Sequence, residues 1–155
     1  MAVSTTARQV ISALYGGVSP TGTTKYMAEQ PTYAAQALVW SGVDKGGRAG
    51  GQVAAAIGQG AREESYLIKG LARVQNTATD TTDAQIFKAV NTAQVGAYAV
   101  ADSVADWLRN NPTCGIAGVR FAELEHVGLK QTWDQADSKI RIATVEFQVR
   151  VHARI

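Results

Sequence analysis

A single apolar stripe runs through residues 83–110 and constrains the fold more than any other feature of the chain. Its members recur every seven residues, with a second set between them: Ile86, Ala93, Val100 and Trp107, and Val90, Ala97 and Val104. This spacing predicts one amphipathic helix of about 26 residues, roughly 39 Å long. Asn110-Asn111-Pro112 ends the helix, because proline cannot continue it. A helix with one apolar stripe has to pack on another apolar surface.

The C-terminal part of the chain has the alternating pattern of a β-hairpin. Residues 119–133 form one predicted arm, 134–138 the turn and 139–155 the other arm. In the last arm the apolar residues change parity after Ile142, which predicts a β-bulge near residues 143–145. One face of this arm is then apolar, and the other carries Glu146, Gln148, Arg150, His152 and Arg154. Such a strand is typical of an antiparallel sheet that a helix covers on one side.

Further elements are predicted before the long helix. Apolar residues at helical spacing predict a helix over 4–15, with Ser4 as its N-cap. A short apolar run predicts a strand over 36–40. Alternation predicts a clear strand over 64–76 and a weaker one over 52–58.

Two segments lack the periodicity of a helix or a strand. Residues 16–31 are rich in Gly, Pro, Thr and Ser, and residues 42–51 are rich in glycine, so both are predicted to be flexible loops or arms. The whole pattern predicts one α+β domain over 1–155. It consists of an antiparallel sheet with the long helix on one face, an N-terminal helix and flexible loops.

The composition excludes several classes of protein. With 155 residues, 46% hydrophobic and 18% charged, the chain is typical of a globular domain and unlike a disordered one. A net charge of +2 is too small to indicate sequence-specific nucleic-acid binding. There is no signal-peptide pattern, and no apolar run approaches the roughly 20 residues of a membrane span. The only cysteine, Cys114, cannot form an intramolecular disulfide, so we expect a soluble protein that folds in a reducing cytoplasm.

Neither a phosphate-binding loop nor a nucleophile is indicated. The glycines of residues 46–51 are followed by Gln52-Val53, whereas a phosphate-binding loop needs Lys and then Ser or Thr after its last glycine. Cys114 has no histidine nearby in the sequence that would lower its pKa. We therefore expect no enzyme activity and no cofactor.

One cluster contains potential metal ligands. Glu123 and Glu125 share a face of the predicted strand while His126 points away, so the three side chains do not converge. His152 on the paired arm could approach His126, but two histidines are an incomplete site. The ordinary interpretation is a solvated strand face, and we expect no bound metal.

The order of the elements carries a family resemblance. After the N-terminal helix and the first strand come ESYLIKGLARV at 64–74, AxxVADxVADWL at 97–108, and the paired strands GVRFAE at 118–123 and IATVEFQVRV at 142–151. Over residues 36–155 this order resembles the tail terminator proteins of tailed bacteriophages and related neck or tail-completion proteins. The glycine-rich stretch 42–51 is not matched to the family pattern.

The resemblance implies a structural virion protein made in the host cytoplasm. Its α+β subunit would form a homo-oligomeric ring, usually of six copies, on the last ring of the tail tube. The ring would stop tube polymerisation and offer a surface to a head-tail connector or neck protein, and its lumen could let DNA pass. Alternatives are another self-assembling neck, connector or tail tube protein, or a small cytoplasmic enzyme.

Six residues are candidates for contact with a neighbouring subunit or with the tube. Ring interfaces join two different patches of one subunit. The two-faced C-terminal strand is a candidate edge for such contact, and residues 16–31 are a candidate arm. Trp133 adjoins the predicted turn, and tryptophan is enriched at interfaces. The candidates are Lys45, Arg48, Trp133, Arg150, His152 and Arg154.

Overall fold

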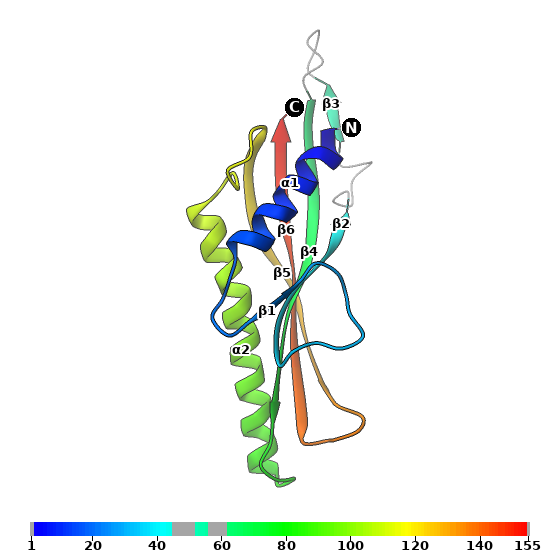
Figure 1. Ribbon diagram of the computed structural model, residues 1–155, viewed down its shortest axis with the longest axis vertical. Helices are drawn as coiled ribbons and strands as arrows, with labels where there is room; N and C mark the ends of the chain where they lie inside the picture. Colours follow the sequence, from blue (N-terminus) through cyan, green and yellow to red (C-terminus); the bar gives the residue numbers. More distant parts are fainter. Residues whose placement is uncertain (1, 45–51, 56–61, 155) are drawn as a thin grey trace.

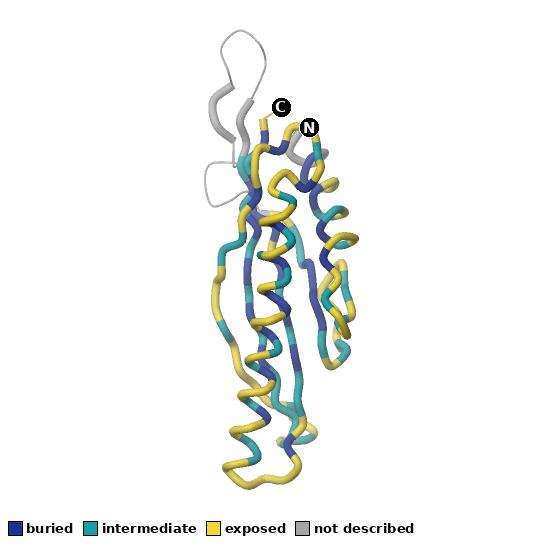
Figure 2. Tube along the Cα trace, turned by 90° about the vertical axis from the view of Figure 1, so that its left-hand side faces the viewer, coloured by how far each residue is buried: buried dark blue, intermediate teal, exposed yellow. Residues whose placement is uncertain are grey.

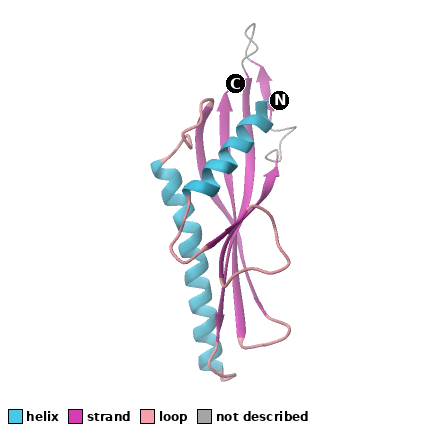
Figure 3. Cartoon of the chain, in the orientation of Figure 1, coloured by secondary structure: helices cyan, strands magenta, loops and turns pink. Residues whose placement is uncertain are grey.

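A computed structural model describes residues 2–44, 52–55 and 62–154 of the chain. The elements, in chain order, are α1 (Ala2–Gly17), β1 (Thr24–Tyr26), β2 (Gln36–Asp44), β3 (Gln52–Ala55), β4 (Arg62–Thr77), α2 (Asp83–Asn110), β5 (Val119–Trp133) and β6 (Ile140–Arg154). Both helices lie against one face of the sheet (Figure 1, Figure 3). The predicted α+β fold, with the long helix on a mostly antiparallel sheet, is confirmed.

The strands of the described chain form one sheet in the order β1-β2-β4-β6-β5, with β3 paired to β4. β1 runs parallel to β2, and the other neighbouring pairs are antiparallel. β5 and β6 form the predicted hairpin, and β6 lies inside the sheet, between β4 and β5. The sheet therefore has two lateral edges, one formed by β5 and the other by β2 with the short strand β1.

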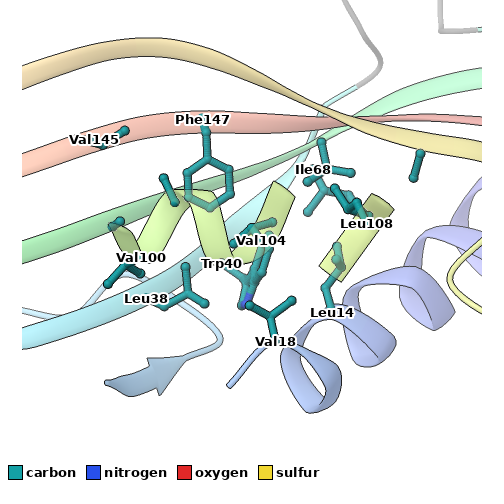
Figure 4. Close-up of a cluster of buried hydrophobic side chains, with 14 of the residues drawn as sticks. Leu14, Val18, Leu38, Trp40, Ile68, Val100, Val104, Leu108, Val145 and Phe147 are labelled. Carbon is teal, nitrogen blue, oxygen red and sulfur yellow. The ribbon is translucent and has the colours of Figure 1, made fainter. Parts of the chain in front are cut away.

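The core lies between the helices and the sheet (Figure 4). At its centre Trp40 of β2 and Phe147 of β6 meet edge to face, with ring centroids 5.6 Å apart. Gly70 of β4 leaves the space that the Phe147 ring occupies, because a Cβ there would lie 2.7 Å from the ring. Leu14 of α1 and Val104 of α2 close over this pair from the helix side.

The predicted stripe of α2 faces the sheet along most of its length, and buried and exposed residues alternate along the helix in Figure 2. Ile86 and Trp107, the two ends of the seven-residue repeat, are only half-buried. A seven-residue repeat drifts by about 20° per heptad around a straight helix, so its last member turns off the sheet. Trp107 packs instead over Gly17 of α1. The buried residues are Ala89, Ala93, Ala97, Val100, Ala101, Val104 and Leu108.

The predicted bulge in the last strand is wrong. The register between β6 and β4 runs without a break along β6. Ile140 and Ile142 are half-buried on the face opposite the helices, whereas Val145 is buried on the helix side. The apolar residues of β6 thus move from one face of the sheet to the other after Ile142, and no extra residue is inserted in the strand. The bulges lie on the neighbouring strand β5, around Arg120 and Val127.

The N-terminal region is more ordered than predicted. α1 begins at Ala2, so Ser4 lies inside the helix and is not its N-cap. The loop predicted over 16–31 contains the end of α1 and the strand β1. Lys25 of β1 donates from Nζ to the carbonyl oxygen of Tyr15 at 2.7 Å, which satisfies a carbonyl near the end of α1.

The strand predicted over 36–40 continues to Asp44. A bulge between Trp40 and Gly42 carries the strand past the glycine, and the Ser41 hydroxyl donates to the Lys69 carbonyl oxygen at 3.3 Å. The segment predicted to be flexible, 42–51, therefore begins inside a strand, and its residues 45–51 lie outside the described residues. Of the strand predicted over 52–58, β3 covers Gln52–Ala55, and the rest lies outside the described residues.

Candidate subunit interface

Three of the predicted interface residues lie on β6. The prediction that this strand forms an edge is wrong, because β4 and β5 flank it on both sides. Arg150 lies on the face opposite the helices and donates from Nε to Oε2 of Glu125 at 2.8 Å. Gln148 donates from Nε2 to Oε1 of the same carboxylate at 2.8 Å. These hydrogen bonds, chiefly the one from Arg150, hold the pKa of Glu125 below its ordinary value.

The other two residues of this strand differ in their surroundings. His152 stacks on Phe121 of β5, with ring centroids 4.3 Å apart and 25° between the ring planes. The side chain of Arg154 is exposed, and its backbone N–H donates to the Gly118 carbonyl oxygen at 2.6 Å. Arg150 and His152 are therefore engaged within the subunit. Lys45 and Arg48 lie outside the described residues.

Trp133 is the predicted interface residue that the structure places at a sheet edge. It ends β5, and 53% of its surface is exposed. The guanidinium carbon of its cross-strand partner Arg141 stands 5.7 Å from the ring centroid. On the helix side, Trp133 lines a small hollow with Val90 and Ala93 of α2. The indole is thus held in place from one side and open to a partner on the other.

The two histidines do not approach each other. His126 lies on the helix side of β5, where its ring centroid is 6.2 Å from that of Tyr98 on α2. His152 is stacked on Phe121 on the opposite face of the sheet. Across residues 2–44, 52–55 and 62–154, no three His, Cys, Asp or Glu side chains are grouped so that they could hold a metal ion.

Cys114 lies in the turn between α2 and β5 and is buried. Its backbone adopts a φ of 54°, in the left-handed region. Burial raises the pKa of its thiol to about 11. The thiol is therefore protonated at neutral pH, and a protonated thiol is a poor nucleophile.

A groove of about 610 Å³ separates α2 from β5. Its floor and walls include Leu108 and Arg109 from the helix side and Ala122, Leu124 and His126 from the strand. α2 lies mainly over β4 and β6, so it covers the edge strand only in part. No sequence segment signals this groove, because it depends on where the helix crosses the sheet.

Exposed large apolar side chains gather at the two lateral sides of the sheet. Val90 lines the hollow beside Trp133, and Tyr98 contacts His126, so this helical face of α2 borders β5. Among the described residues, the exposed large apolar side chains on the β5 side are Phe87, Tyr98, Phe121, Val127 and Trp133. On the β1–β2 side they are Met27 and Val43, and Val95 lies on the outward side of α2.

No protein-family model matches the sequence, and no curated protein matches it at a significant level. Neither helix of the described chain is both long and apolar enough to cross a membrane. Among solved structures, the chain is similar to a chain from the virion of a native gene transfer agent particle, with 17% sequence identity and a TM-score of 0.39. That match covers 97% of this chain and 92% of the other.

Proposed function

We propose that this protein is a structural virion protein that forms a closed ring at the head-proximal end of a phage tail tube. The observation that carries the proposal is the gathering of exposed apolar side chains at both lateral sides of the sheet, notably Trp133 on one side and Val43 on the other. A subunit with two different adhesive sides joins head to tail, and such heterologous contacts form a ring when the rotation closes.

The order of the elements supports the tail terminator role within this class. The N-terminal helix, the long strand β4, the long helix α2 and the final hairpin follow one another as in the pattern that carries the family resemblance. The face of the sheet opposite the helices carries two ion pairs between neighbouring strands, Arg150 with Glu125 and Lys130 with Glu146. A hydrated face of this kind suits a surface along which DNA passes without being read by sequence.

In this role the subunits contribute surfaces and no catalytic group. One side of the ring matches the growing end of the tube, and the other side does not repeat that surface, so no further tube subunit can add. The partners are then further copies of the chain, the tail tube protein and a head-tail connector or neck protein.

Removing the gene from an infecting phage and imaging the products by electron microscopy tests this function. Tails of uncontrolled length, or heads and tails left unjoined, are the expected result, and supplying the protein in trans should restore normal particles. Particles without any tail tube would instead indicate a tube subunit. Normal infectious particles made without the protein would exclude a role in tail completion.

A further inference from the structure

We propose that the ring closes through main-chain pairing of β5 of one subunit with β2 of the next, so that the sheet continues across the interface. This inference rests on the ring of the proposed function and specifies which strands join. The partner is thus a second copy of this chain, and the contact is an extended strand rather than a helix or a loop.

The outer edge of β5 has main-chain groups available for a partner. The N–H of Ala122 points away from β6 and donates to the carbonyl oxygen of Pro112 at 2.8 Å. Since these groups alternate in direction along a strand, the N–H and carbonyl of Leu124 point to the same outer side. In the part of the chain that the structure describes, Leu124 has no main-chain partner on that side.

The opposite edge of the sheet is also open over a short run. β1 pairs only with Ala37, Leu38 and Val39 of β2, and β3 pairs with β4 beyond the end of β2. Residues 40–44 of β2 therefore have no strand on their outer side among the described residues. Val43 lies in this run and is 43% exposed.

The directions of the two edge strands fit a head-to-tail ring. β2, β4, β6 and β5 are antiparallel in turn, so β2 and β5 run in opposite directions. Rotation about an axis along the strands keeps these directions in each copy. β5 of one subunit therefore meets β2 of the next in antiparallel orientation, which continues the pattern inside the subunit.

The register also brings matching residues level with each other. Leu124 pairs with Val149, which pairs with Ile68, which pairs with Val43. In a flat ring without rise, Leu124 thus lies beside Val43 of the next copy. Val149 and Ile68 are buried on the helix side, so Leu124 and Val43 also lie on that face. The groove between α2 and β5, which Leu124 lines, gives room for the side chain of Val43 of the next copy.

The open run of β2 is short and both edge strands are bulged, which favours closure over open-ended aggregation. Bulges at Ser41 on β2 and at Val127 on β5 interrupt the straight runs that face outward. Bulged and short edges resist pairing with unrelated strands. Only a partner that presents a run of the right length and direction fits, and the chain's own opposite edge does so.

A disulfide trap tests this pairing. The double variant Leu124→Cys with Val43→Cys is made in a Cys114→Ala background, so that no other thiol is present. A disulfide needs Cα atoms about 5.5 Å apart, a distance that neighbouring strands provide. Oxidation of the assembled ring should give a covalent ladder up to the full ring on a non-reducing gel. Either single-cysteine variant should give no ladder, and reduction should collapse the ladder to single chains.

The outcomes separate this inference from the proposed function. Rings that form normally but give no ladder would overturn the β5–β2 pairing and leave the ring intact. A purified parent protein that stays monomeric by native mass spectrometry would instead contradict the ring itself.

A second pair of variants tests the same pairing in case the double-cysteine variant does not fold. Val43→Lys should lower the ring population about tenfold or more, because lysine on an edge strand opposes pairing. Val95→Lys, equally drastic but on the outward side of α2, should assemble like the parent. Equal ring populations for Val43→Lys and the parent would overturn the inference.

Discussion

At the scale of single residues, two adjacent glycines at the end of α1 have opposite surroundings. A Cβ at Gly17 would lie 2.5 Å from the indole of Trp107, whereas one at Gly16 would have no atom within 4 Å. We expect Gly17→Ala to push α1 off α2 and lower the free energy of unfolding by about 2 kcal/mol. Gly16→Ala should leave it unchanged or raise it by up to about 1 kcal/mol, because alanine favours a helix.

Chemical denaturation of the two glycine variants checks this difference in one experiment. Both substitutions add the same methyl group to the same helix end, so each serves as the control for the other. A Gly17→Ala subunit as stable as Gly16→Ala would mean that Trp107 does not fix the position of α1.

A single residue of the candidate interface can be predicted from the sequence only where its residue type alone indicates exposure at an interface. The sequence predicts Trp133 as an interface residue because it adjoins a turn and tryptophan is enriched at interfaces. The prediction of Arg150 and His152 rests on their position on the polar face of a two-faced strand. Glu125 and Phe121 of the neighbouring strand β5 engage them within the subunit, and such contacts cannot be identified from the sequence of one strand.

At the scale of elements, the packing of α2 on the sheet makes a sharp prediction. Val100 is buried in the core, while Val95 on the same helix is 61% exposed. Val100→Asp would bury a charge without a partner, so we expect a loss of about 3 kcal/mol or more in the free energy of unfolding. Val95→Asp should change it by less than about 1 kcal/mol. Thermal melting of the two variants checks this, and equal melting temperatures would contradict the packing of α2.

The sequence predicts where elements begin and end better than how they pair. The bounds of α2 and of the hairpin follow from local periodicity and from turn residues, and they agree with the structure to within a few residues. The alternation of apolar and polar residues along β6 indicates only that helices cover one face of this strand. That pattern is the same for an interior strand and for an edge, so β6 was wrongly predicted as an edge.

At the scale of the whole molecule, the groove beside β5 and the open run of β2 depend on how elements that are distant in the sequence pack together. The groove beside β5 exists because α2 lies over β4 and β6 and leaves the edge strand partly uncovered. The open run of β2 exists because β1 is only three residues long. Neither feature has a local signature, and β1 itself lies in the segment 16–31, for which the sequence predicts only a flexible loop or arm.

Assembly should depend on the aromatic end of β5 far more than on charges at the rim. Trp133 is exposed at the edge strand that we assign to the interface, whereas Arg154 is an exposed charge at the end of an interior strand. We expect Trp133→Ala to raise the concentration at which rings dissociate about tenfold or more, because buried interface aromatics dominate binding. Arg154→Ala should change it by less than about threefold, since exposed charges contribute little.

Native mass spectrometry over a dilution series measures both dissociation concentrations, and melting of the dissociated subunits controls for folding. Because about half of the Trp133 surface is buried in the subunit, its removal should cost the isolated fold about 2–3 kcal/mol at most, which the melting measurement separates from any loss of assembly. A weaker ring with an intact subunit therefore locates the indole in the contact between copies. If Trp133→Ala rings dissociate at the same concentration as the parent, this end of β5 faces solvent in the assembly.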